Sequence, residues 1–106
     1  MSELFMLAKL KAKVGSESIM EKELKSLMEA THSEPGCLLY ALHRDFNDSS
    51  QFVIIERFIS KEAVDSHYAS SHFLKHFSLI SPLLVNEPEI IHLNSMGDGK
   101  KGKVFG

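Results

Sequence analysis

The sequence predicts an α+β domain with the order β-α-β-β-α-β, the ferredoxin-like arrangement in which helices cover one face of an antiparallel sheet. Four runs have the alternation or apolar character of strands, and two longer stretches have the periodicity of amphipathic helices. Turn residues separate these segments. A length of 106 residues suits one small domain.

The first half of the chain is predicted to form a strand and a helix. Residues 4–14 are predicted to form a strand that Gly15 ends. Its first part, "LFML", is apolar on both faces, and apolar residues alternate with lysines over residues 8–14. An amphipathic helix follows, for which Ser16 or Ser18 is the expected N-cap and Ser18 with Glu21 would form a capping box. One helical face collects the residues Met20, Leu24, Leu27, Met28 and Thr31.

A hairpin and a second helix are predicted next. After the turn "EPG", strands at residues 37–46 and 51–59 are joined by the turn "NDSS". Ser60 is expected to cap a helix that Pro82 ends. A break is expected near residues 70–71, within "ASS". The helical pattern resumes beyond it.

A last strand is predicted at residues 87–96, so the domain is expected to span residues 1–96. Residues 97–106 read as a glycine- and lysine-rich tail. The formal net charge of −2 argues against nucleic acid or an anionic membrane as the partner. No apolar run reaches the roughly 20 residues of a membrane span. A cytoplasmic location is therefore expected.

Both faces of the predicted sheet are apolar, which predicts a homodimer. The third strand places Phe52, Ile54 and Phe58 on one face and Val53, Ile55 and Ile59 on the other. The helices can cover only one of these faces, and soluble monomers rarely expose a large apolar surface. We therefore expect a twofold dimer in which sheet packs against sheet.

Two residues are the candidate catalytic groups. Glu56 interrupts an apolar strand, where a carboxylate is either a structural hydrogen-bond acceptor or a base with a raised pKa. His67 follows Ala63 and Val64 on the helix face expected to turn toward the sheet. It is either a general base or a hydrogen-bonded core histidine.

No metal site is predicted. His67 and His72 lie about 140° apart on a continuous helix, so they can share an ion only if the helix breaks between them. His72 and His76 share a face, but the glutamate of a zinc protease is absent between them. The single cysteine, Cys37, excludes an internal disulfide.

Other catalytic classes find little support. Tyr40 and Tyr68 could orient a phenolic ligand, or could be core aromatics with a solvated hydroxyl. Ser70 and Ser71 lack a convincing triad order, and there is no glycine-rich phosphate loop.

Several runs together resemble the antibiotic biosynthesis monooxygenase (ABM) domain family. They are "EPGCLLYAL", "FVIIERFISKEAVDSHYASSHF" and "LLVNEPEI", and the similarity extends over residues 4–95. The positions that match the family pattern are Glu34, Pro35, Gly36, Cys37, Tyr40, Glu56, Phe58, Ala63, His67, Ser71, His72 and Phe73.

The resemblance implies a dimeric α+β barrel and a cavity between helices and sheet. It also implies a monooxygenase that acts on a small aromatic or quinol-like substrate with O₂ and uses no metal, flavin or haem. His67 and Glu56 would then be catalytic, and the substrate-binding residues would be Tyr40, His72, Phe58 and Phe73. The chain has no tryptophan, and His67 stands where haem-degrading relatives have one, so haem degradation is not expected.

Two alternatives stay open at this stage, because function resides in the site rather than in the fold. One is an isomerase of a small polar metabolite, for which His43 and Arg44 are the only nearby phosphate-binding candidates. The other is a small-ligand-binding module without catalysis.

Overall fold

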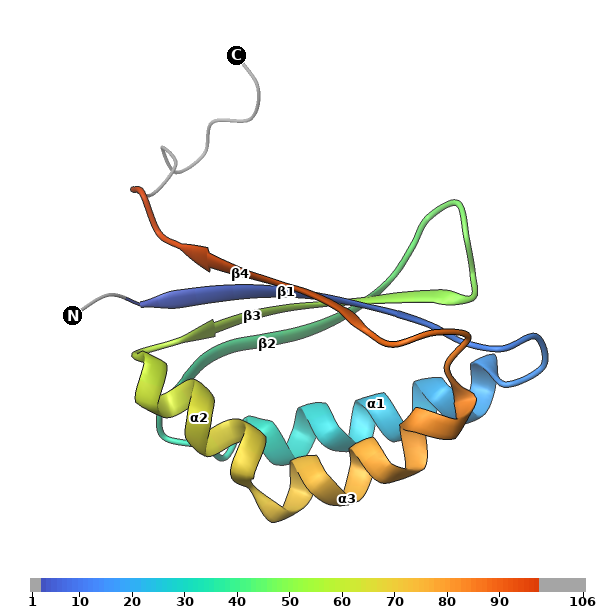
Figure 1. Cartoon of the computed structure of the whole chain (residues 1–106), viewed down its shortest axis with the longest axis horizontal. Helices are drawn as coiled ribbons and strands as arrows, with labels where there is room; N and C mark the ends of the chain where they lie inside the picture. Colours follow the sequence, from blue (N-terminus) through green and yellow to red (C-terminus); the bar gives the residue numbers. More distant parts are fainter. Residues whose placement is uncertain (1–2, 98–106) are drawn as a thin grey trace.

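The computed structural model describes residues 3–97, which form one four-stranded antiparallel sheet with all helices on one face (Figure 1). The strands, in the spatial order β2-β3-β1-β4, are β1 (Leu4–Lys11), β2 (Cys37–Arg44), β3 (Gln51–Phe58) and β4 (Glu89–Asn94). The helices are α1 (Glu17–Thr31), α2 (Lys61–Ala69) and α3 (Ser71–Ile80), followed by the 3₁₀ turn η1 (Ser81–Leu83). The predicted ferredoxin-like fold is confirmed. The predicted tail lies outside the described residues, apart from Gly97.

The junction between β1 and α1 differs from the prediction. Pairing of β1 with β3 and β4 stops at or before Lys11, although the alternating pattern continues to Val14, which is 98% exposed. The predicted capping box is wrong. Helix α1 begins at Glu17, and the side chain of its N-cap residue, Ser16, makes no capping hydrogen bond. Instead, Glu17 Oε1 accepts a hydrogen bond from the backbone N–H of Gly15, which has a φ of 89°.

The core lies between the sheet and the helices. Helix α1 buries Met20, Leu24, Leu27 and Thr31, as its periodicity predicts. Alternate residues of β3 point into the same layer, and they include Glu56 among large apolar side chains. The alternation of inward and outward residues along β3 therefore places the carboxylate of Glu56 in the core. Within residues 3–97, no helix combines the length and the apolar character needed to cross a membrane.

Ser70 divides the second helical segment. Its backbone is extended, with φ −69° and ψ 149°, so α2 ends and α3 begins at this residue. The Ser70 hydroxyl donates a hydrogen bond to the carbonyl of His67 at 2.6 Å and accepts one from the N–H of Phe73 at 3.2 Å. One side chain thus closes α2 and caps α3. The break expected near residues 70–71 is present.

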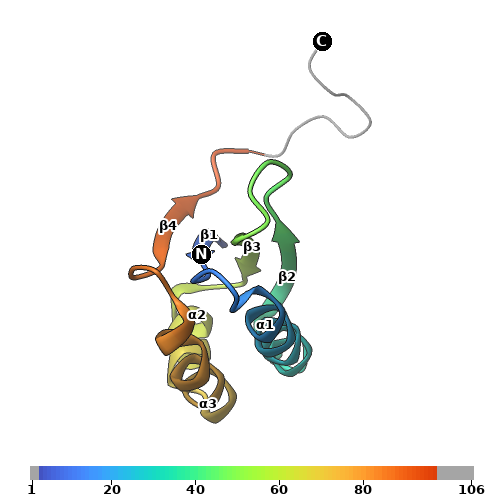
Figure 2. The ribbon, with the colours of Figure 1, turned by 90° about the vertical axis from the view of Figure 1, so that its right-hand side faces the viewer.

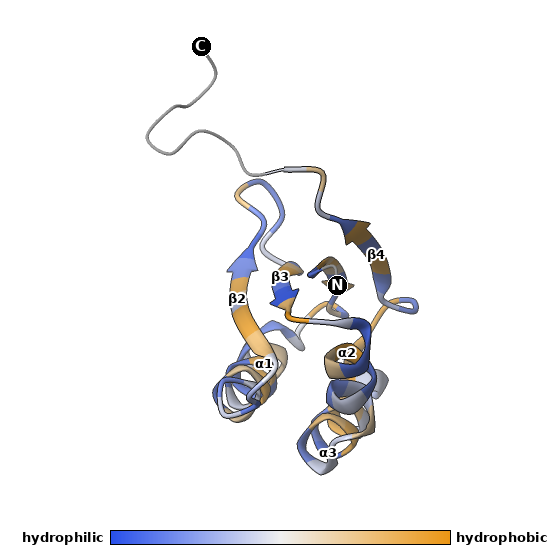
Figure 3. Ribbon diagram, turned by 90° about the vertical axis from the view of Figure 1, so that its left-hand side faces the viewer, coloured by the Kyte–Doolittle hydropathy of each residue, from blue (hydrophilic) through white to orange (hydrophobic). Residues whose placement is uncertain are grey.

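No helix of the described chain covers the second face of the sheet (Figure 2), and this face carries apolar side chains. Cross-strand pairing aligns Ala41, Ile55, Leu7 and Ile91 in one row across all four strands. Several apolar side chains on β2 and β4 are well exposed, with Leu39 at 40%, Ile91 at 39% and Leu93 at 46% (Figure 3). The two-faced apolar sheet inferred from the sequence is therefore present. The dimer that it implies stays a prediction.

Candidate functional site

His67 is the centre of the candidate site. It lies near the end of α2 and is only 1% exposed, because Val64 and His67 are the helix positions that turn toward the sheet. The inward orientation predicted from the helical spacing is therefore confirmed. Four aromatic rings surround its imidazole at centroid distances of 5.2–5.7 Å, contributed by Tyr40, Phe58, Tyr68 and Phe73.

Glu34 connects His67 to a second histidine. This glutamate follows α1, where its backbone N–H donates to the carbonyl of Thr31. One carboxylate oxygen, Oε2, lies 2.9 Å from His67 Nδ1 and 2.5 Å from His72 Nε2. Because an ionised carboxylate only accepts hydrogen bonds, both ring nitrogens act as donors here.

This arrangement selects the tautomer of His67. With its proton on Nδ1, the neutral ring keeps Nε2 free to accept a proton. Burial lowers the pKa of His67 below its usual value, and this effect outweighs the neighbouring charge of Glu34. His67 is consequently neutral near pH 7, the form that a general base requires.

Glu56 is the second ionisable group in the core. It lies in the middle of β3, opposite Met6 on β1 and Tyr40 on β2, and is 4% exposed. Its Oε1 has no hydrogen-bond partner within residues 3–97. Burial, and secondarily the charge of Glu34, raises the pKa of Glu56 to about 8. At neutral pH this side chain is mainly a carboxylic acid, which can donate a hydrogen bond.

A small, mainly apolar cavity joins these groups. Its volume is about 40 Å³, and its polar edges come from Tyr40, Glu56, His67 and Tyr68. Burial raises the pKa of Tyr68 to about 12, and that of Tyr40 still further, so both phenols keep their protons. The cavity has room for a water or an O₂ molecule, whereas an aromatic ring needs a cavity of roughly 150 Å³. An aromatic ligand therefore requires the lining side chains to move apart.

The predicted site residues do not all reach this cavity. Tyr40 and Phe73 line it, together with His67 and Glu56. Phe58 is fully buried and contacts the His67 ring but does not line the cavity, so its role in binding substrate stays a prediction. His72 likewise is not part of the lining.

The three histidines of α2 and α3 do not all share one hydrogen-bond partner. His72 bonds Glu34, whereas His76 Nδ1 lies 3.0 Å from Oε1 of Glu23 on α1. The break at Ser70 fulfils the one condition under which His67 and His72 could meet, and their ring centroids are 6.3 Å apart. Glu34 was part of the family-like run "EPGC", but nothing local in the sequence assigns it a role, because its partners lie 33 and 38 positions away.

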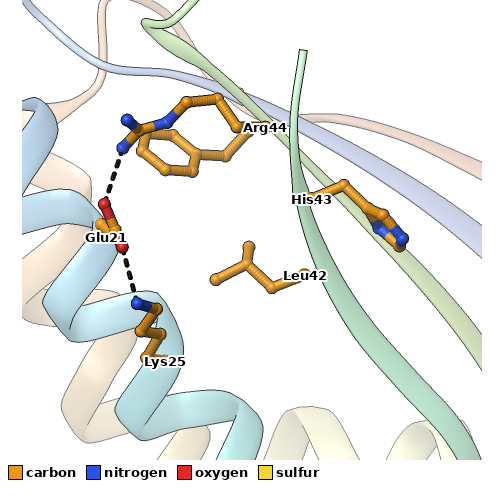
Figure 4. Close-up of a pocket in the computed structure, with 6 residues that line it drawn as sticks. Glu21, Lys25, Leu42, His43 and Arg44 are labelled. Carbon is orange, nitrogen blue, oxygen red and sulfur yellow. Dashed lines mark hydrogen bonds and ion pairs between the residues drawn. The ribbon is translucent and has the colours of Figure 1, made fainter. Parts of the chain in front are cut away.

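His43 and Arg44, the residues considered for phosphate binding, lie in a different pocket (Figure 4). This surface pocket of about 230 Å³ shares no lining residue with the cavity at His67. Arg44 pairs with Glu21 at 2.9 Å, and its guanidinium lies 4.5 Å from the ring centroid of Phe52. Glu21 also pairs with Lys25. Both cations of this pocket are thus held by one carboxylate, which cancels one of their two positive charges. The pocket also lies apart from the cavity at His67, so it gives the isomerase alternative no specific support.

Comparison with known proteins agrees with this fold. The family model described as "Antibiotic biosynthesis monooxygenase" matches residues 4–78. The chain is 28% identical over 83 residues to "Putative monooxygenase Rv0793" of Mycobacterium tuberculosis, covering 78% of this chain and 81% of that protein.

Solved structures show the same architecture. The structure of Rv0793 superposes with a TM-score of 0.88 at 23% identity, covering 93% of this chain and 100% of the other. PA3566 of Pseudomonas aeruginosa superposes with a TM-score of 0.84 at 32% identity, covering 92% of this chain and 97% of the other. From the extent of the family match and this likeness, the chain belongs to the antibiotic biosynthesis monooxygenase family.

Proposed function

We propose that this protein is a monooxygenase that oxidises a small quinol-like aromatic compound with O₂, with no metal, flavin or haem in the reaction. The observation that carries the proposal is the buried His67 imidazole, whose Nδ1 is bonded to Glu34 and which borders a mainly apolar cavity together with Glu56. A group able to accept a proton, a group able to donate one and an apolar wall border the same space, and this supports the proposal.

The first step is removal of a substrate hydroxyl proton by Nε2 of His67. Glu34 stabilises the resulting imidazolium through the hydrogen bond to Nδ1. The phenolate charge spreads to a ring carbon that carries one hydrogen, and this carbon reacts directly with O₂. The O₂ molecule supplies the oxidising power, so no other oxidant is required.

The second step returns the proton. The carbon forms a bond to one oxygen atom, and the distal oxygen takes the proton from His67 to give a hydroperoxide. Loss of the carbon-bound hydrogen and of the distal oxygen as water leaves a carbonyl group. One oxygen atom of O₂ thus enters the product and the other enters water, as monooxygenation requires.

Glu56, Tyr40 and Tyr68 would stabilise the charged substrate. A neutral carboxylic acid and two protonated phenols can each donate a hydrogen bond to the phenolate oxygen. Their surroundings are apolar, so such bonds would be stronger than in water. A buried carboxylic acid that stays neutral and donates to an oxyanion is known chemistry in other enzymes.

The test is O₂ consumption with a panel of quinols and anthrones by wild type, His67→Ala and His76→Ala. His76 is a matched control, because it lies on the next helix and is also paired with a glutamate. We expect O₂ uptake by wild type and by His76→Ala. The rate for His67→Ala should be lower by a factor of at least about 100. Equal rates for all three would exclude His67 as the base. If the compounds bind but no O₂ is consumed, the protein is a ligand-binding module.

A further inference from the structure

We propose that Glu34, His67 and His72 form a binding site for a divalent transition ion of the zinc type, and that the bound ion blocks the base function of His67. The ligand atoms would be Glu34 Oε2, His67 Nδ1 and His72 Nε2. They lie within 4.8 Å of one another. This binding property goes beyond the proposed oxidation and is independent of any substrate.

The ligand set has the chemistry of a zinc site. Two imidazoles and one carboxylate are a common protein ligand set for Zn²⁺ that leaves a fourth position for water. Tetrahedral ligation at about 2.0–2.1 Å separates ligand atoms by roughly 3.3 Å. The present separations from Glu34 Oε2 are 2.9 Å to His67 and 2.5 Å to His72. The glutamate must therefore move outward by less than about 1 Å. The two imidazole nitrogens, which lie within 4.8 Å of each other, must also reach a separation of roughly 3.3 Å to admit the ion.

The site is supported on its inner side and open on its outer side. The aromatic rings around His67 hold its imidazole in place. The side chains of Glu34 and His72 are 14% and 24% exposed, which gives an ion access from solvent. Glu34 also borders an outer pocket of about 340 Å³ that Ser60, Ser66 and Ser70 help to line. Water in this pocket could occupy the fourth position.

Metal binding would change which nitrogen of His67 carries the proton. Without metal, Nδ1–H donates to Glu34 and Nε2 is free. With metal on Nδ1, the neutral imidazole carries its proton on Nε2, which then cannot accept another. On His72 the metal would occupy Nε2, which leaves the ring proton on Nδ1. A metal ion bound to Nδ1 of His67, outside the cavity, would thus prevent Nε2 inside the cavity from accepting a proton.

The test is titration of the chelator-treated, full-length protein with Co²⁺ and Zn²⁺ in the absence of substrate. Co²⁺ bound tetrahedrally has visible absorption, and a chromophoric chelator reports competition by Zn²⁺. The variants are Glu34→Ala and His72→Asn, with His76→Asn as the control on the same helix. Circular dichroism confirms that each variant is folded.

We expect one ion per chain for wild type and His76→Asn, with tetrahedral Co²⁺ absorption. Both Glu34→Ala and His72→Asn should weaken binding about tenfold or more. Equal affinity of wild type and His72→Asn, or no binding by folded wild type, would overturn the proposal. Because no substrate is present, either result is independent of whether the chain consumes O₂.

Discussion

The carboxylate of Glu34 accepts a hydrogen bond of 2.9 Å from His67 Nδ1, although 33 positions separate the two residues in the chain. The pair joins the turn after α1 to the end of α2 and places a charged group behind a buried imidazole. A carboxylate in this position orients a histidine and stabilises its protonated form.

Glu34→Ala tests this positioning role. We expect about a 100-fold loss of O₂ consumption, because the tautomer of His67 is no longer selected. The unfolding free energy should fall by roughly 1–3 kcal/mol, since a buried N–H loses its acceptor. Nitrogen-15 NMR of the imidazole should show the Nδ1–H form in wild type and loss of this preference in the variant. Glu23→Ala, which breaks the Glu23–His76 pair, is the control and should leave the His67 tautomer unchanged.

Glu56→Gln tests the raised pKa of the buried acid. The folded-state pKa is about 8 and the unfolded value is 4.5, so between these values the folded protein binds more protons. This contribution to stability is complete below pH 4.5 and is lost as the pH rises toward 8, at about 1 kcal/mol per pH unit. The variant, which carries a neutral amide, should lack this loss and should be more stable than wild type at pH 8.

The measurement is urea unfolding with a chelator present, from pH 7 upward. His67 has its pKa lowered from 6.5, so its own opposite effect on stability lies mainly below that range. Tyr40 and Tyr68 also adjoin the cavity, but their raised pKa values leave them protonated throughout. The exposed Glu29→Gln is the control. Parallel pH profiles for wild type and Glu56→Gln would refute the raised pKa.

Gly36→Ala tests the close contact between the start of β2 and α2. A methyl group at Gly36 would lie 2.5 Å from Cβ of Ala63, which is closer than carbon atoms can approach. Helix α2 must then move, and we expect a loss of about 1–3 kcal/mol in unfolding free energy. His67 lies one turn beyond Ala63, so O₂ consumption should fall as well.

The double variant Gly36→Ala/Ala63→Gly is the matched control for this prediction. It removes the opposing methyl group at the cost of one glycine in a helix, about 1 kcal/mol. It should be less destabilised than the sum of the two single variants. Additive losses would mean that the clash does not determine the effect.

Ser70→Ala tests the break between α2 and α3. Its hydroxyl caps α3 and bonds the carbonyl of His67, so its loss should cost about 1 kcal/mol. Ser60→Ala removes the N-cap of α2, whose hydroxyl accepts from Ala63, and should cost a similar amount. Only Ser70→Ala should also reduce O₂ consumption and metal affinity, because the break is what brings His72 to Glu34. An equal effect of both variants on Co²⁺ binding would contradict this.

Ile91→Lys tests the predicted dimer. Ile91 ends the apolar row across the open face of the sheet, where a charge would be buried on association. Sedimentation at micromolar concentration should give a dimer for wild type and a monomer for this variant. Ile19→Lys on α1, where the side chain is 56% exposed, is the control and should stay dimeric. A monomeric wild type would refute the sheet-to-sheet dimer.

Local patterns in the sequence determined the elements and their faces. Alternation predicted the first strand, and apolar runs bounded by turn residues predicted the others. The three- and four-residue spacing of Met20, Leu24 and Leu27 predicted the buried face of α1. The inward position of His67 and the carboxylate of Glu56 within the core follow from the same periodicities. These features depend on a residue and its near neighbours, so one short window contains the information.

Only the tertiary structure decided which of these residues meet. Pairing of β1 with β3 and β4 ends by Lys11, and beyond it the backbone of Ala12 and Lys13 bonds to the turn before β3 and to the segment around Leu84 instead. Alternation along one strand does not show which neighbour it pairs with. Glu34 contacts His67 because the turn after α1 lies next to α2. It also contacts His72 because the break at Ser70 changes the direction of the chain between the two histidines. Contacts over 33 and 38 positions depend on the path of the whole backbone, which no local pattern records.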